Sequence, residues 1–186
     1  MRTTFAVLCV VLAAAAAAAG SAQQVYAFYH DCSGGQDVEV NLISTMPSAT
    51  EYTLAVYDAW GEVLWADSGT LGPYEAAFYR LGEAISSDQF NWGVAVVRSD
   101  ERLIIGLEYT YDDQLVSVDT VYKPVAELTP GEPFWAGAYY TQVAAASTGL
   151  VVMNPWGEQA YCSLSVYRQD GETLHEEDLT LGPHES

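Results

Sequence analysis

Apolar residues along this chain recur at every second position. In the segment 51–58, one face of the expected strand carries Tyr52, Leu54 and Val56, and the segments 94–99 and 114–122 alternate in the same way. Alternate side chains point to opposite faces of a β-strand, and the valine, isoleucine, threonine and tyrosine that dominate these runs favour strands. The pattern predicts about eight strands, near residues 25–30, 37–44, 51–58, 62–69, 74–81, 92–98, 102–110 and 114–122.

Short turn sequences separate these runs. They contain the glycine, proline, asparagine or aspartate that reverses a chain, and they lie at 33–35, 60–61, 71–73, 91–93 and 99–101. Seven or eight short antiparallel strands in about 100 residues are typical of an immunoglobulin-like β-sandwich. We therefore expect an all-β protein, with one short helical turn around residues 83–88.

An internal repeat with an offset of 110 residues organises the chain. The segment 54–75, LAVYDAWGEVLWADSGTLGPYE, matches the segment 164–185, LSVYRQDGETLHEEDLTLGPHE, at eleven of 22 positions without a gap. Ordinary composition would give roughly one or two matches. Residues shared across the offset, such as Tyr57/Tyr167 and Pro73/Pro183, are interpreted as scaffold.

The repeat divides the chain into four parts. Residues 1–22 precede the first copy (residues 23–123), a proline-rich linker covers 124–133, and the second copy covers 134–186. The second copy stops at the equivalent of Ala76, so we expect half of a sandwich there and a sequence that belongs to a longer protein. Because an incomplete sandwich leaves strand edges unpaired, self-association through this open unit is also expected.

Residues 1–22 have the features of a signal peptide. Arg2 precedes an apolar run from Phe5 to Ala19, and small residues precede a cut after Ala22. The sequence therefore predicts a secreted, extracellular or periplasmic protein with no stable membrane span after cleavage. Export would permit a disulfide between Cys32 and Cys162, but the two residues are not equivalent in the repeat, which favours unpaired cysteines.

The chain is strongly acidic. Its net charge is −19, and loss of Arg2 with the signal peptide gives −19 − 1 = −20. Such a surface repels nucleic acid and anionic lipid, so neither is an expected partner. It stays soluble and attracts cations.

The order of a Val-Tyr-x-x-x-Gly hairpin, Leu-Gly-Pro and the segment VVRSDERLII (residues 96–105) resembles the sensory-rhodopsin-transducer type of β-sandwich. The resemblance covers residues 38–111. It implies a small sandwich of a kind used for protein or sugar binding, and it transfers no binding residue to this chain.

Catalytic motifs are absent from the sequence. None of the three histidines, His30, His175 and His184, recurs in the other copy, and no nucleophile elbow or phosphate-binding loop is present. We expect no enzymatic activity and no cofactor. Asp112 and Asp113 supply oxygen ligands of the kind that Ca²⁺ prefers, with a solvated hairpin turn as the alternative.

Two tryptophans lie in expected turns where the copies differ. Trp60 stands where the second copy has Asp170, and Trp156 where the first has Met46. An exposed indole can stack on a sugar or anchor a protein partner, whereas an indole that folds back only covers the end of the sandwich. The sequence favours a non-catalytic structural or adhesive module that contacts a protein or glycan surface. The alternative is a carbohydrate-binding module that uses Trp60 or Trp156.

Overall fold

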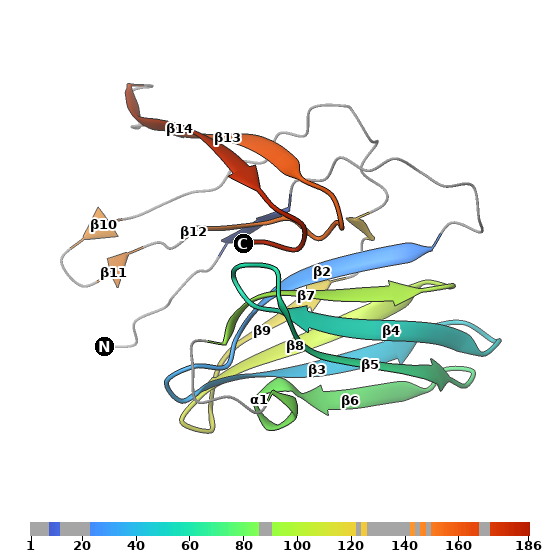
Figure 1. The fold of residues 1–186 in the computed structure, drawn as a ribbon. Helices are drawn as coiled ribbons and strands as arrows, with labels where there is room; N and C mark the ends of the chain where they lie inside the picture. The colour runs from blue at the N-terminus through green and yellow to red at the C-terminus, as the bar shows by residue number, and fades with distance from the viewer. Residues whose placement is uncertain are drawn as a thin grey trace.

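A computed structural model describes residues 8–11, 23–85, 91–121, 124–125, 142–143, 146–147, 150–167 and 172–186. The described chain is mostly β, and its main sheets are antiparallel (Figure 1). The first copy contains β2 (Gln24–Asp31), β3 (Gln36–Ser44), β4 (Thr50–Tyr57), β5 (Val63–Leu71), β6 (Ala76–Arg80), α1 (Leu81–Ala84), β7 (Trp92–Ser99), β8 (Leu103–Tyr111) and β9 (Gln114–Val121). All eight predicted strands are confirmed to within two residues, and the helical turn lies slightly earlier than expected.

These eight strands form two four-stranded sheets, in the orders β2-β7-β4-β5 and β6-β3-β8-β9. All eight strands contribute residues to a common core, including Tyr26, Leu54, Val40 and Ile105, and the edge strand β9 contributes only the partly buried Val121. The Tyr26 hydroxyl accepts a hydrogen bond from the Leu103 backbone N–H at 2.8 Å, so this buried polar group is satisfied. The first two strands of this unit, β2 and β3, lie in different sheets, whereas the first two strands of an immunoglobulin constant domain share one sheet.

The remaining strands are β1 (Leu8–Val11), β10 (Gln142–Val143), β11 (Ala146–Ser147), β12 (Leu150–Met153), β13 (Ala160–Tyr167) and β14 (Thr173–Leu181). The β13–β14 hairpin reproduces the β4–β5 hairpin at the repeat offset: Thr50 pairs with Leu71, and Ala160 pairs with Leu181. Both hairpins have a bulge at the same place, after Val56 and after Val166.

The turn after each hairpin is also the same in the two copies. Tyr74 and His184 both adopt a left-handed backbone, with φ of 58° and 57°. Three backbone hydrogen bonds recur in the two copies. In the first copy they run from Ser44 N to Glu75 O (2.9 Å), from Tyr74 N to Met46 O (3.2 Å) and from Glu75 N to Gly72 O (3.2 Å). In the second copy the equivalent bonds run from Asn154 N to Glu185 O (2.8 Å), from His184 N to Trp156 O (3.1 Å) and from Glu185 N to Gly182 O (3.3 Å).

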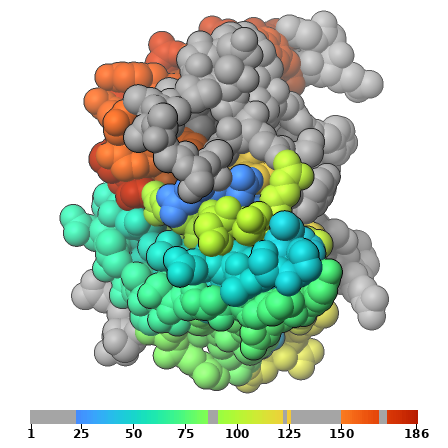
Figure 2. Space-filling view, turned by 90° about the vertical axis from the view of Figure 1, so that its right-hand side faces the viewer, coloured from blue at the N-terminus to red at the C-terminus, as the bar shows by residue number. Residues whose placement is uncertain are grey.

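The outer face of the β2-β7-β4-β5 sheet is covered by residues of the second copy. Met153 is fully buried there, and Val151 and Trp156 pack beside it. The face that they cover consists of Val25, Ala27, Tyr29, Ala55, Tyr57, Val94 and Val96. Figure 2 shows β2 (blue) and β7 (yellow-green) at the boundary between the orange-red C-terminal strands and the cyan-green strands of the first copy. The neighbouring strands β2 and β7 are therefore covered on both faces along most of their length.

The predicted linker lies mostly outside the described residues. Of its two described members, Val125 is buried in the same cluster. In the segment predicted as a signal peptide, β1 pairs in parallel with β12. Within the described part of the chain, no helix is long and apolar enough to cross a bilayer.

Candidate functional site

The loop that joins β4 to β5 projects Trp60 into the solvent. Asp58 Oδ1 accepts hydrogen bonds from the backbone N–H groups of Trp60 and Glu62, both at 2.9 Å. Gly61 closes the loop with φ of 85°, a conformation that favours glycine. Trp60 is 68% exposed and lies on a well-defined loop at the hairpin tip, so of the two alternatives that the sequence left open its indole is the exposed one.

Trp156 lies in a different environment. Its backbone N–H donates to Asn154 Oδ1 at 3.1 Å, and its indole packs at the margin of the apolar cluster that joins the copies. The indole Nε1 is buried without a hydrogen-bond partner in the described structure. The Trp156 indole therefore packs against the sheet, which corresponds to the alternative in which the indole folds back.

The C-terminal segment brings these two loops into one region. The Ser186 backbone N–H donates to Ala59 O at 3.1 Å, next to Trp60, and the carbonyl of Trp156 accepts from His184. The rings of Tyr57 and His184 stack with centroids 4.0 Å apart and an angle of 17° between planes. Tyr57 was interpreted as scaffold because both copies contain it, and here it also forms a contact between copies.

Gly61 is required for this contact as well as for the turn. A Cβ atom at Gly61 would lie 2.2 Å from the carbonyl oxygen of Pro183, which is far too close for any side chain. The shared glycine therefore lets the C-terminal segment approach the hairpin tip directly.

His184 is neutral in this contact at neutral pH. Burial lowers the pKa of His184, and the positive charge of Arg98 lowers it further, while a hydrogen bond with the Pro155 backbone acts in the opposite direction. A neutral imidazole suits an apolar interface, because a charged ring would have to lose its hydration there.

A buried histidine, His30, contacts the end of β4, next to the hairpin tip. His30 Nε2 lies 2.8 Å from the Tyr57 carbonyl oxygen, and Nδ1 has no partner among the described residues. Burial lowers the pKa of His30, although this hydrogen bond and the charges of Asp31 and Asp58 act against burial. The neutral ring with its proton on Nε2 therefore donates to the Tyr57 carbonyl and fixes the end of β4.

Asp112 and Asp113 form the two-residue turn between β8 and β9, with φ of 45° and 59°. Both central residues in the left-handed region define a tight hairpin of the I′ kind. Asp112 N donates to Gly35 O at 2.8 Å, and Asp113 accepts from Arg80 Nη2 at 3.0 Å. This geometry is that of the hairpin turn, which the sequence analysis gave as the alternative to a calcium site. Calcium binding by these two residues stays a prediction.

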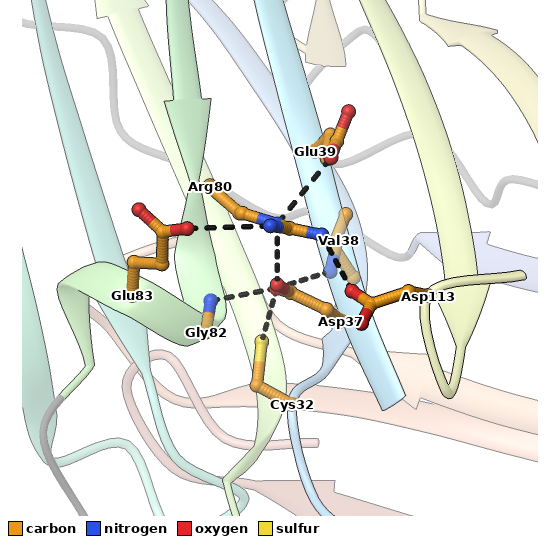
Figure 3. A network of polar contacts seen from close by, with 8 residues as sticks. All are labelled: Cys32, Asp37, Val38, Glu39, Arg80, Gly82, Glu83 and Asp113. Atoms are coloured by element: carbon orange, nitrogen blue, oxygen red, sulfur yellow. Dashed lines mark hydrogen bonds and ion pairs between the residues drawn. The ribbon is translucent and has the colours of Figure 1, made fainter. Parts of the chain in front are cut away.

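Arg80 supplies the positive charge in this acidic region (Figure 3). Its Nε lies 3.2 Å from Asp37 and 3.3 Å from Glu39, and its Nη1 lies 3.3 Å from Glu83. Asp37 Oδ1 also accepts the backbone N–H groups of Val38 and Gly82, at 2.7 and 2.6 Å. Within the described residues, no group of three or more potential ligands is arranged to hold a metal ion.

Replacing Arg80 with glutamine should destabilise the protein mainly at low salt. Asp37, Glu39, Glu83 and Asp113 would then repel one another without a neighbouring cation, and mobile ions would screen this repulsion. We expect a lower thermal midpoint than the parent protein at 50 mM NaCl, and a much smaller difference at 1 M. Arg80→Lys keeps the positive charge and should lose less stability; equal losses in the two variants would contradict a role for the charge of Arg80.

The two cysteines of the sandwich region are free thiols, Cys32 and Cys162. Burial raises the pKa of Cys32 to about 12, and the neighbouring Asp37 adds to this shift. Cys32 is therefore a protonated, unreactive thiol, which agrees with the expectation of unpaired cysteines.

Comparisons with models of protein families, with curated proteins and with solved structures give no match. The functional argument therefore rests on the fold and on the contacts of the described residues. Sequence reasoning located Trp60 but missed the contact between the copies. The available signal was the run Val94–Val97, which is apolar on both faces of its strand and thus typical of a strand covered on both sides.

Proposed function

We propose that this chain is a non-catalytic, exported β-sandwich repeat protein with a structural or adhesive role, either secreted or held at the cell surface or in the periplasm. In this proposal, residues 1–22 are a signal peptide and both copies belong to immunoglobulin-like sandwich repeats. The partner is a protein or glycan surface.

The contact between the copies is the observation that carries this proposal. Val151 and Met153 cover an apolar sheet face, and Tyr57 stacks on His184, so the two copies share one packed interface. In repeat proteins, such interfaces between neighbours give an extended and rigid body. Rigid attachment of one copy to the next suits a spacer or an adhesive arm.

Two measurements test the proposal. Mass spectrometry of the protein exported by a bacterial host should find Gln23 as the first residue. NMR relaxation should then give the same rotational correlation time for β7 and β13. Retention of residues 1–22 would contradict export, and independent tumbling of the two copies would contradict the rigid spacer.

Trp60 favours carbohydrate binding as the second candidate function. Its indole is 68% exposed, and the Asp58 hydrogen bonds fix the loop that presents it. A sugar ring can stack on such a face with little loss of side-chain freedom. Trp156, which the sequence also suggested for this role, is less accessible because its indole packs between the copies.

A glycan array followed by titration of any glycan that binds tests this second candidate. Trp60→Ala should weaken binding by about tenfold or more, the effect of losing a central aromatic contact. Tyr111→Ser serves as the matched control, because Tyr111 is an exposed aromatic residue at the end of β8, away from the Trp60 loop. Absence of glycan binding, or a neutral effect of Trp60→Ala, would exclude carbohydrate binding through this residue.

A further inference from the structure

Tyr57 lies between two histidines, one from each copy. Its carbonyl oxygen lies 2.8 Å from His30 Nε2, and its ring stacks on His184 with centroids 4.0 Å apart. His30 belongs to β2 of the first copy, whereas His184 follows β14 of the second. The end of β4 therefore joins two titratable rings across the contact between the copies.

Each of these rings has one buried nitrogen atom without a hydrogen-bond partner among the described residues. The atoms are His30 Nδ1 and His184 Nδ1, and the indole Nε1 of Trp156 in the same contact is also buried without a partner. A neutral imidazole carries a single proton, which each ring can place on the nitrogen that has an acceptor. A second proton would add a buried N–H donor with no acceptor, together with a positive charge, and both are unfavourable in apolar surroundings. The contact therefore favours neutral rings.

The elements packed around His184 add to this preference. Burial lowers the pKa of His184, and the positive charge of Arg98, on β7, lowers it further, while the hydrogen bond with the Pro155 backbone acts in the opposite direction. Tyr57, on β4, contributes its ring face. In the turn that contains His184, the Glu185 carboxylate accepts a hydrogen bond from the Gly182 backbone N–H.

His30 has a different set of neighbours but the same preference. Burial lowers its pKa, although the hydrogen bond with Tyr57 and the charges of Asp31, on β2, and Asp58, after β4, act against burial. Both rings have an ordinary pKa of 6.5 when water reaches them. Because the contact lowers these pKa values, it keeps its full stability above pH 6.5 and loses stability as the pH falls below that value.

We propose that the contact between the copies is an acid-sensitive switch. In acid, His184 takes up a proton, its stacking on Tyr57 is lost, and the second copy separates from the outer face of β2 and β7. His30 strengthens the response when the end of β4 opens as well. The inference rests on the rigid contact of the proposed function and adds the condition under which that contact opens, so that a spacer that is stiff at neutral pH becomes jointed in acid.

The size of the response follows from the titration of His184. A ring that titrates at pH 6.5 in the open form, and far lower in the closed form, favours opening by a factor of about 30 at pH 5.0 and by almost nothing at pH 7.5. We therefore expect the equilibrium constant for opening to rise by up to about 30-fold between these two pH values.

Oxidation of Met153 by hydrogen peroxide, followed by mass spectrometry of the exported chain, measures this opening. Met153 is fully buried in the contact, so it reacts when the contact opens, and the partly exposed Met46 of the first copy is an internal reference. The rate for Met153 relative to Met46 should rise by up to about 30-fold from pH 7.5 to pH 5.0. A low ratio at both pH values would overturn the switch but leave the rigid spacer standing. A ratio near one at both would contradict the contact itself.

Three variants separate His184 from the carboxylates that also titrate in acid. His184→Tyr should remove most of the response. Tyrosine suits this turn, because Tyr74 adopts the same backbone in the first copy, with φ of 58° against 57°. Arg98→Gln should reduce the response, because the cation that disfavours the protonated ring is lost. His175→Gln, at an exposed histidine of β14, should respond like the parent chain. A full response in His184→Tyr, or its loss in His175→Gln, would overturn the inference, and circular dichroism checks that each variant is folded.

Discussion

Val96→Asp is expected to detach residues 150–186 from the sheet of the first copy. Val96 is fully buried in the cluster between the copies, where an aspartate would be an unpaired charge in apolar surroundings. Such a charge should lower the free energy of unfolding by roughly 3 kcal/mol or more, unless the second copy separates and lets water reach it. Hydrogen exchange should therefore lose protection in β12, β13 and β14 before it does in β3 or β8.

Val118→Asp provides the matched control. Val118 lies on the edge strand β9 and is 64% exposed, so the same substitution there should change stability by only about 0.5 kcal/mol or less. Unchanged protection of β13 and β14 in Val96→Asp would show that the second copy does not depend on this face for its stability.

Gly93→Ala is expected to disrupt the end of the sandwich that carries the hairpin tip. A Cβ atom at Gly93 would lie 2.3 Å from Tyr57 O and 2.6 Å from the Asp58 carbonyl carbon, and neither backbone atom can move without breaking β4 pairing or the hydrogen bond to His30. Overpacking of this kind should cost about 2–3 kcal/mol.

Gly106→Ala tests the same substitution without the clash. Its Cβ would contact the Asn41 Cβ at 3.6 Å, an ordinary van der Waals distance. We expect a gain of about 0.4–1 kcal/mol, because alanine restricts the unfolded chain. Urea unfolding midpoints compare the two variants, and similar midpoints would contradict the argument that the backbone of residues 57–58 occupies this space.

The strands were predictable because each depends on a local pattern. A period of two in residues 51–58 determines which side chains face the core, and this requires no knowledge of distant segments. The sequence also indicated that the two copies share a turn, because the eleven shared positions include Leu-Gly-Pro. The backbone hydrogen bonds of this turn recur in both copies. The sheet to which each strand belongs could not be predicted from this local pattern.

The contact between the copies could not be predicted in the same way. Trp60 and Trp156 both occupy turns, yet Trp60 is exposed and Trp156 packs on another unit's sheet. The difference arises because the second copy covers one face of one sheet and leaves the hairpin tip uncovered. This contact joins segments about 55–60 residues apart in sequence, such as Val94–Val96 and Met153, so a local pattern does not show it. Likewise, the role of Asp113 depends on Arg80, which lies on a separate strand.

The doubly covered sheet has a consequence for the order of synthesis. Val121, the last residue of β9, precedes Met153 by 153 − 121 = 32 residues. At about 5–20 residues per second, the ribosome needs roughly 2–6 s to add them. During this interval a folded first copy displays Val25, Ala27, Val94 and Val96 to its surroundings, and a chaperone that shields this face until Met153 emerges would protect the nascent chain from aggregation.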